Sequence, residues 1–137
     1  LDHMAAEGRD SLEELVGLLV RPVVGKLDDP DGGADYLLVV ADLCTSRSFP
    51  IISMPAISGP GALELSARMM RHIAAIPPQF IQLRMMRVAN VLYGSIANYH
   101  WLVSAGFGIP RAAFVEELIT TLVAVIGANY RDTSTKD

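Results

Sequence analysis

The chain has 137 residues, of which 51% are hydrophobic and 19% charged, and its formal net charge is -4. The length fits one domain with a core of its own. The chain has 11 Lys plus Arg against 15 Asp plus Glu, a balance that argues against a basic surface binding nucleic acid through this chain alone. A charged fraction this low predicts apolar surface beyond what one subunit hides, to be covered by a partner subunit or an apolar ligand.

The first predicted helix spans residues 11–26. Ser11 followed by Glu14 is the signature of a capping box, and leucines and valines recur at helical spacing after it. Pro22 lies inside this helix and is expected to kink it, because proline removes a backbone donor. Residues 28–33, Asp-Asp-Pro-Asp-Gly-Gly, then predict a tight turn.

The second predicted helix covers residues 34–46. The adjacent Val39 and Val40 would also suit a strand, but the segment does not alternate between apolar and polar residues, so a helix is favoured. Its apolar stripe consists of Tyr36, Leu37, Val40, Ala41 and Cys44.

Residues 48–61 form a segment of a different kind. Pro50, Pro55 and Pro60 prevent regular structure, yet the residues between them are mostly apolar. We expect this loop to pack on the domain or beside the mouth of a pocket. A third helix is predicted over residues 62–75, and the pair Pro77-Pro78 ends it and opens the next one.

Two long helices, over residues 78–104 and 111–128, close the domain. Each is apolar on two faces, and nothing charged lies between Glu117 and Arg131. A helix that is apolar nearly all round is covered on two sides. We therefore predict an all-α fold in which the last two helices, antiparallel to each other, form a four-helix bundle with a second copy of the chain. The predicted dimer-interface residues are Leu92, Ile96, Tyr99, Val103, Val115, Leu118, Ile119, Leu122 and Ile126.

A pliable pocket for a small apolar or amphipathic molecule is the second candidate site. Methionines suit such surfaces, although ordinary core packing remains the default explanation for them. Asn90 and Tyr93 share a helix face and are expected either to bond within the core or to orient a ligand. Arg84 and Arg87 are expected on a solvated face, with capture of an acidic ligand as the alternative. The predicted ligand-binding residues are Cys44, Met54, Met70, Ile73, Met86, Asn90, Tyr93 and His100.

The sequence carries no recognisable catalytic or metal set, so no enzyme activity, metal or cofactor is expected. No histidine is spaced with acids as metal ligands are, and adjacent glutamates on a helix point about 100° apart, which suits no acid/base pair. A lone cysteine, Cys44, excludes an intramolecular disulfide; it is expected to act as a small hydrophobe, with redox sensing as the alternative. With no secretory signal and no apolar run long enough for a membrane span, the expected location is cytoplasmic.

The order of several short motifs resembles the C-terminal domains of TetR-family transcriptional regulators. The resemblance covers essentially the whole chain, although each motif alone is weak. It rests on the segments Leu-Asp-His-Met-Ala-Ala-Glu-Gly (1–8), Leu-Glu-Glu-Leu-Val (12–16), Leu-Val-Arg-Pro-Val-Val (19–24), Asp-Pro-Asp-Gly (29–32), Tyr-Leu-Leu-Val (36–39), Ile-Pro-Pro-Gln-Phe (76–80) and Leu-Arg-Met-Met-Arg (83–87).

This resemblance implies a cytoplasmic homodimer, usually a repressor, whose last two helices form the dimer bundle and whose earlier helices hold an effector. It implies that residues 1–10 end a connecting helix from a helix-turn-helix headpiece that is missing from this chain and would supply the contact with operator DNA. Residues 11–128 would then be the ligand-binding and dimerisation domain, and 129–137 a frayed tail. The proline-rich loop departs from the family pattern, in which a charged helix is common. A non-regulatory dimerisation or adaptor domain is the alternative function.

Overall fold

The computed structural model describes residues 11–46, 60–73 and 75–133. Within these ranges the chain is all-α and contains no strand. The helices are α2 (Leu12–Gly25), α3 (Gly33–Thr45), α5 (Pro60–Met70), α6 (Pro78–Ser104) and α7 (Arg111–Gly127), with short 3-10 turns η1 (Lys26–Asp28) and η3 (Arg71–Ile73). The predicted helices are confirmed, except that the third is shorter, because it tightens into η3 after Met70. The predicted connecting helix at 1–10, most of the loop 48–61 and the end of the tail lie outside the described residues.

Local signals set the helix ends. The backbone N–H of Glu14 donates to Ser11 Oγ at 3.1 Å, which confirms Ser11 as the N-cap of α2. Pro78 opens α6, where its missing N–H costs nothing. α2 continues through Pro22 to Gly25. Pro22 has no N–H to donate to the carbonyl of Leu18, four residues back. Both residues are exposed, so this carbonyl is on the solvent side of the helix.

The turn between η1 and α3 is held by hydrogen bonds to Asp29 and contains one glycine, Gly32, in a left-handed conformation. The N–H of Asp31 donates to Asp29 Oδ1 at 2.9 Å, and the N–H of Gly33 donates to the Asp29 carbonyl at 3.1 Å. Gly32 has a φ of 86°, a left-handed conformation that favours glycine. The predicted turn is thereby confirmed, and it brings the start of α3 close to η1.

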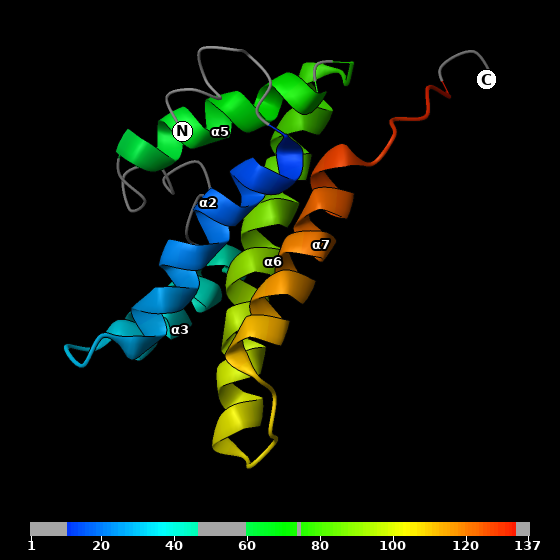
Figure 1. The fold of residues 1–137 in the computed structure, drawn as a ribbon. Helices are drawn as coiled ribbons and strands as arrows, with labels where there is room; N and C mark the ends of the chain where they lie inside the picture. Colours follow the sequence, from blue (N-terminus) through cyan, green and yellow to red (C-terminus); the bar gives the residue numbers. More distant parts are fainter. Residues whose placement is uncertain (1–10, 47–59, 74, 134–137) are drawn as a thin grey trace.

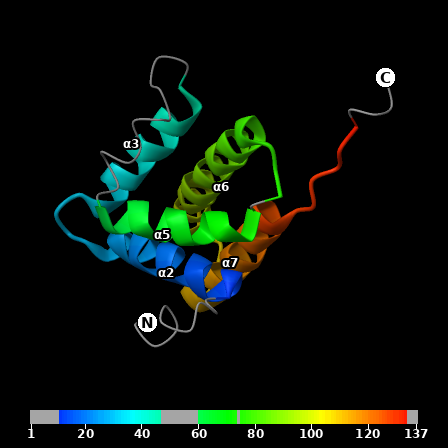
Figure 2. The ribbon, with the colours of Figure 1, turned by 90° about the horizontal axis from the view of Figure 1, so that it is seen from above.

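The two long helices form the centre of the molecule. α6 and α7 run side by side and antiparallel, α3 packs on α6, α2 packs on α7, and α5 lies across α2 (Figure 1). Seen from above, α3 lies on one side of α6 and α2 and α7 on another, while no described helix covers the remaining side (Figure 2). No helix in the described ranges is long and apolar enough to cross a membrane.

The core fills the space between these helices. Its fully covered residues include Leu15 and Val16 of α2, Ile96 of α6, and Leu122 of α7. Both apolar faces of α7 are occupied within the chain, one by α2 and the other by α6. The two-faced pattern of this helix is therefore satisfied by its own subunit.

Candidate functional site

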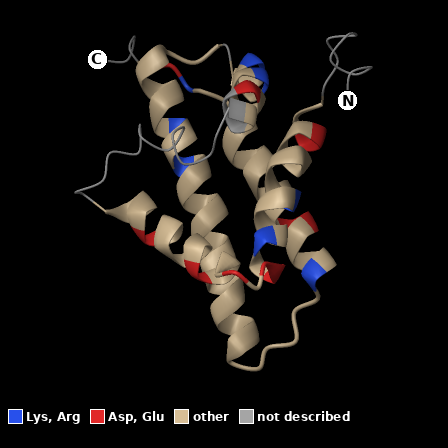
Figure 3. Ribbon diagram, turned by 90° about the vertical axis from the view of Figure 1, so that its left-hand side faces the viewer, with Lys and Arg blue, Asp and Glu red and all other residues tan. Residues whose placement is uncertain are grey.

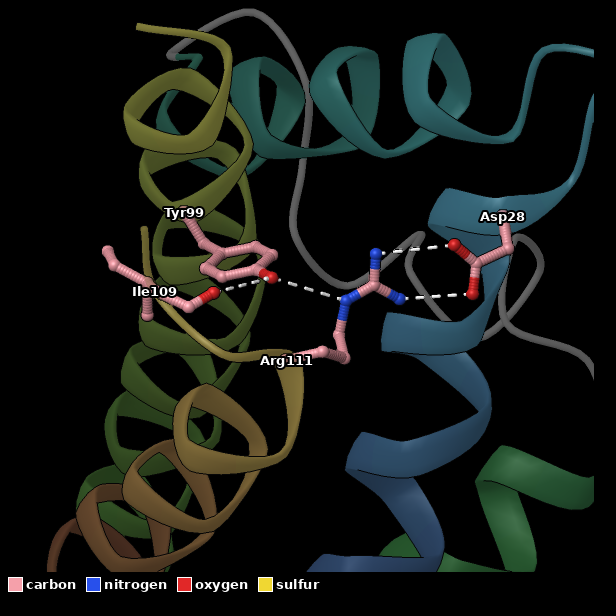
Figure 4. A network of polar contacts seen from close by, with 4 residues as sticks. All are labelled: Asp28, Tyr99, Ile109 and Arg111. Carbon is pink, nitrogen blue, oxygen red and sulfur yellow. Dashed lines mark hydrogen bonds and ion pairs between the residues drawn. The ribbon is translucent and has the colours of Figure 1, made fainter. Parts of the chain in front are cut away.

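A polar junction ties the turn between α6 and α7 to the end of α2. Arg111, the first residue of α7, donates from Nη1 and Nη2 to the two carboxylate oxygens of Asp28 in η1, at 3.0 and 3.2 Å (Figure 4). Its Nε donates to the hydroxyl of Tyr99 at 3.4 Å, and that hydroxyl donates to the Ile109 carbonyl at 3.4 Å. A cation at the N-terminus of a helix is unfavourable because it opposes the helix dipole, and the paired carboxylate offsets this charge.

Tyr99 holds the junction against the core. Its ring stacks on Phe114 of α7 with a centroid distance of 4.1 Å, and the Arg111 guanidinium lies 5.7 Å from the ring centroid. The hydrogen bond that Arg111 donates to the Tyr99 hydroxyl raises the pKa of Arg111, and the bonds and charge of Asp28 add to this effect. Tyr99 was predicted as a dimer contact, and within the single chain it is 6% exposed.

Arg84 caps the end of α7. This side chain is only 9% exposed, and its Nη1 donates to the carbonyls of Ile126, at 3.0 Å, and of Ala128. The last carbonyls of a helix lack partners and carry partial negative charge, so they suit a buried cation. The expectation of a solvated face for Arg84 is wrong, whereas Arg87 is exposed as expected.

The predicted ligand-binding residues do not converge on one place. Ile73 and Tyr93 are buried in the core, whereas Met70 and Asn90 are exposed, so Asn90 and Tyr93 do not point to a common site. Met54 lies outside the described residues. The remaining members, all half-buried, are Cys44, Met86 and His100.

No reactive or metal-binding centre emerges among these residues. Burial raises the pKa of the Cys44 thiol, which lowers the thiolate fraction and hence its reactivity. No group of three His, Cys, Asp or Glu that could hold a metal ion occurs in the part of the chain that the structure describes.

Most of the predicted dimer contacts are covered by the chain itself. Val103 is 43% exposed, and Val115 is half-buried and packs against the core. The others are at most 6% exposed within the single chain. They are Leu92, Ile96, Tyr99, Leu118, Ile119, Leu122 and Ile126. The exposed surface of α6 and α7 is consequently another side of these two helices.

That side of α6 is a stripe that is exposed except at the half-buried Gly94, and we call it the α6 outer face. Two large apolar side chains mark its ends: Leu83 is 42% and Trp101 67% exposed. Beyond α6, Phe107 in the turn before α7 is 57% exposed. The members of the α6 outer face recur three or four residues apart, as one helix face requires, and are Leu83, Arg87, Asn90, Gly94, Asn98 and Trp101.

Comparisons with known proteins give no match to this chain among family models, curated proteins or solved structures.

Sequence reasoning missed the Asp28–Arg111 junction and the Arg84 cap. Arg111 is 83 residues away from Asp28 and Arg84 is 42 residues away from Ile126, so no local spacing links them. One signal was available, namely a lone cation at the predicted start of the last helix, where a negative charge is preferred.

Proposed function

We propose that this chain is the homodimerising and effector-binding domain of a ligand-responsive transcriptional regulator, a repressor of the TetR type. The observation that carries the proposal is the uncharged exposed surface of the second half of α6. No Asp, Glu, Lys or Arg lies between Arg87 and Arg111, and in this stretch Trp101, Val103 and Phe107 are 67%, 43% and 57% exposed.

Such a surface is characteristic of a protein–protein contact. Figure 3 shows charged residues on the upper part of α6 and on its neighbours, and none on its lower part. Trp101 lies on the α6 outer face, whereas Val103 lies about 200° further round the helix. Interface cores are depleted of charge and enriched in aromatic residues, as this surface is.

The polar junction supports a regulatory role. It connects the turn between the two long helices to η1, which leads into α3. An effector that binds among α2, α3, α5 and α6 more tightly in one arrangement would shift the population toward it. Because Asp28 and Arg111 link these helices to the α6–α7 pair, the shift would reach the dimer contact, and through it a DNA-binding headpiece attached to each subunit.

An adaptor without an effector is the second candidate. The observation that favours it is the scatter of the predicted ligand-binding residues, some buried in the core and others exposed. In that case the chain would only join two copies of whatever is attached to it.

Native mass spectrometry of the purified chain separates these functions. The regulator predicts a dimer that carries a small apolar molecule, or that gains thermal stability from members of a panel of such molecules. A dimer that neither retains nor responds to any of them favours the adaptor. A strictly monomeric species would overturn both.

A further inference from the structure

The geometry of α6 and α7 defines how two copies would meet. Leu83 and Trp101 lie 18 positions apart, which is five turns of helix, or about 27 Å. They therefore point to the same side of α6, and both are exposed at 42% and 67%. Between them, a Cβ added to Gly94 would have no atom within 4 Å, so the middle of the α6 outer face is open and low.

One acidic residue of α7 borders this face. Glu116 accepts from Arg21 of α2 at 2.8 Å, so its side of α7 faces α2, while Phe114 faces α6 through its stack with Tyr99. Glu117 lies about 100° further round the helix than Glu116, on the outward arc between those two directions. It is exposed, and its Oε1 accepts a hydrogen bond from Thr121 Oγ1 at 3.0 Å.

The height of Glu117 along α6 follows from two contacts. Tyr99 lies beside Phe114, and Arg84 lies beside Ile126. Interpolating between them places Glu117 at the level of about Ser95. The exposed cation of the α6 outer face, Arg87, lies about 12 Å away along the axis, and it forms no ion pair with any described residue of its own chain.

We propose that the α6 outer face binds the same face of a second copy, with the two α6 helices antiparallel and a two-fold axis at the level of Leu92; this rests on the homodimer of the proposed function. The axis sets Leu83 of each subunit against Trp101 of the other. It also brings Arg87 of each subunit within one turn of Glu117 of the other.

Two unrelated spacings thus give the same axis. The apolar pair places it at Leu92, and the charged pair places it within about one residue of that level. A two-fold interface requires this reciprocity, because each contact must occur twice. Asn90 then meets Gly94 of the other subunit, where the missing side chain lets the helices approach.

Cysteine cross-linking tests the register. In a Cys44→Ser background, Leu83→Cys and Trp101→Cys proteins are prepared separately, mixed, allowed to exchange subunits and oxidised. We expect a covalent dimer in the mixture and none in either protein alone, because the two copies of each cysteine are about 27 Å apart along the axis.

Charge reversal gives a second readout should the cysteines disturb the fold. Arg87→Glu and Glu117→Arg are each expected to raise the dimer dissociation constant at least tenfold, and the double variant to recover most of the loss. Arg71→Glu, an exposed cation on η3, is the matched control and should leave dimerisation unchanged.

The outcomes distinguish the register from the proposed function. A dimer that forms no mixed cross-link and gains nothing from the double charge reversal overturns this axis and leaves the homodimer intact. Equal cross-linking in the single-variant samples also overturns the axis. A chain that is monomeric before any substitution overturns both the axis and the homodimer.

Discussion

Gly33, the first residue of α3, is buried and packed against backbone. A Cβ built there would lie 1.9 Å from the Lys26 carbonyl oxygen and 2.7 Å from the Asp29 Cβ. Neither neighbour is the end of a flexible side chain, so Gly33→Ala forces the turn and the start of α3 apart. That movement would also lengthen the hydrogen bond from Gly33 N–H to the Asp29 carbonyl.

We expect Gly33→Ala to lower the free energy of unfolding by about 2–4 kcal/mol, the sum of an overpacking cost and a weakened hydrogen bond. Gly25→Ala is the matched control. Gly25 ends α2 with a φ of -58°, and its Cβ position has no atom within 4 Å. There the substitution should stabilise by about 0.4–1 kcal/mol, because it restricts the unfolded chain without a clash.

Urea unfolding followed by circular dichroism at a helix band measures both variants. An unchanged slope with a lower midpoint for Gly33→Ala, and a higher midpoint for Gly25→Ala, is the expected pair of results. If Gly33→Ala were as stable as the unsubstituted protein, the described close approach of α3 to η1 would be refuted.

Three further substitutions or treatments test other contacts. Arg84→Met removes the cation that caps α7 and should cost about 1.5–3 kcal/mol of unfolding free energy; a stability equal to the parent in thermal unfolding would contradict the cap. Asp28→Asn breaks an exposed ion pair, so its cost should stay below about 1 kcal/mol and shrink as salt is added; a larger, salt-independent loss would mean that the junction is not held by charge. Because burial raises its pKa, Cys44 should react with iodoacetamide more slowly than a free thiol near pH 8 and catch up only at higher pH; faster reaction than the free thiol would contradict this environment.

The raised pKa of Cys44 also fixes the sign of its effect on stability. The folded state favours the neutral thiol, and the stability that this preference adds is fully present below the pKa that the Cys44 thiol has in the unfolded chain. It is lost as the pH rises through the higher pKa of the folded state.

Local chemistry made the helices predictable. The Ser11 cap, the Pro78 start and the glycine turn before α3 each follow from a few neighbouring residues, and all are present in the structure. These features depend on backbone hydrogen bonding and allowed φ angles, which a short stretch of sequence determines.

Which helix covers which face was not predictable in the same way. The sequence assigned the second apolar face of α7 to another subunit, whereas α2 covers it. The apolar pattern predicts that a helix face is buried, but it does not identify the helix that covers this face, because any apolar helix can do so. For the same reason the sequence could not place Arg84 in the interior, since its partners are carbonyls at the end of a distant helix.

Trp101 offers the most direct measurement of the central claim, which is that a second copy covers the α6 outer face. It is the chain's single tryptophan, and it is 67% exposed in the isolated subunit. Acrylamide quenching of its fluorescence at tens of micromolar protein should show a shielded indole, with an emission maximum at shorter wavelength than in urea. An indole quenched as readily as in the unfolded chain, at every protein concentration, would contradict the claim.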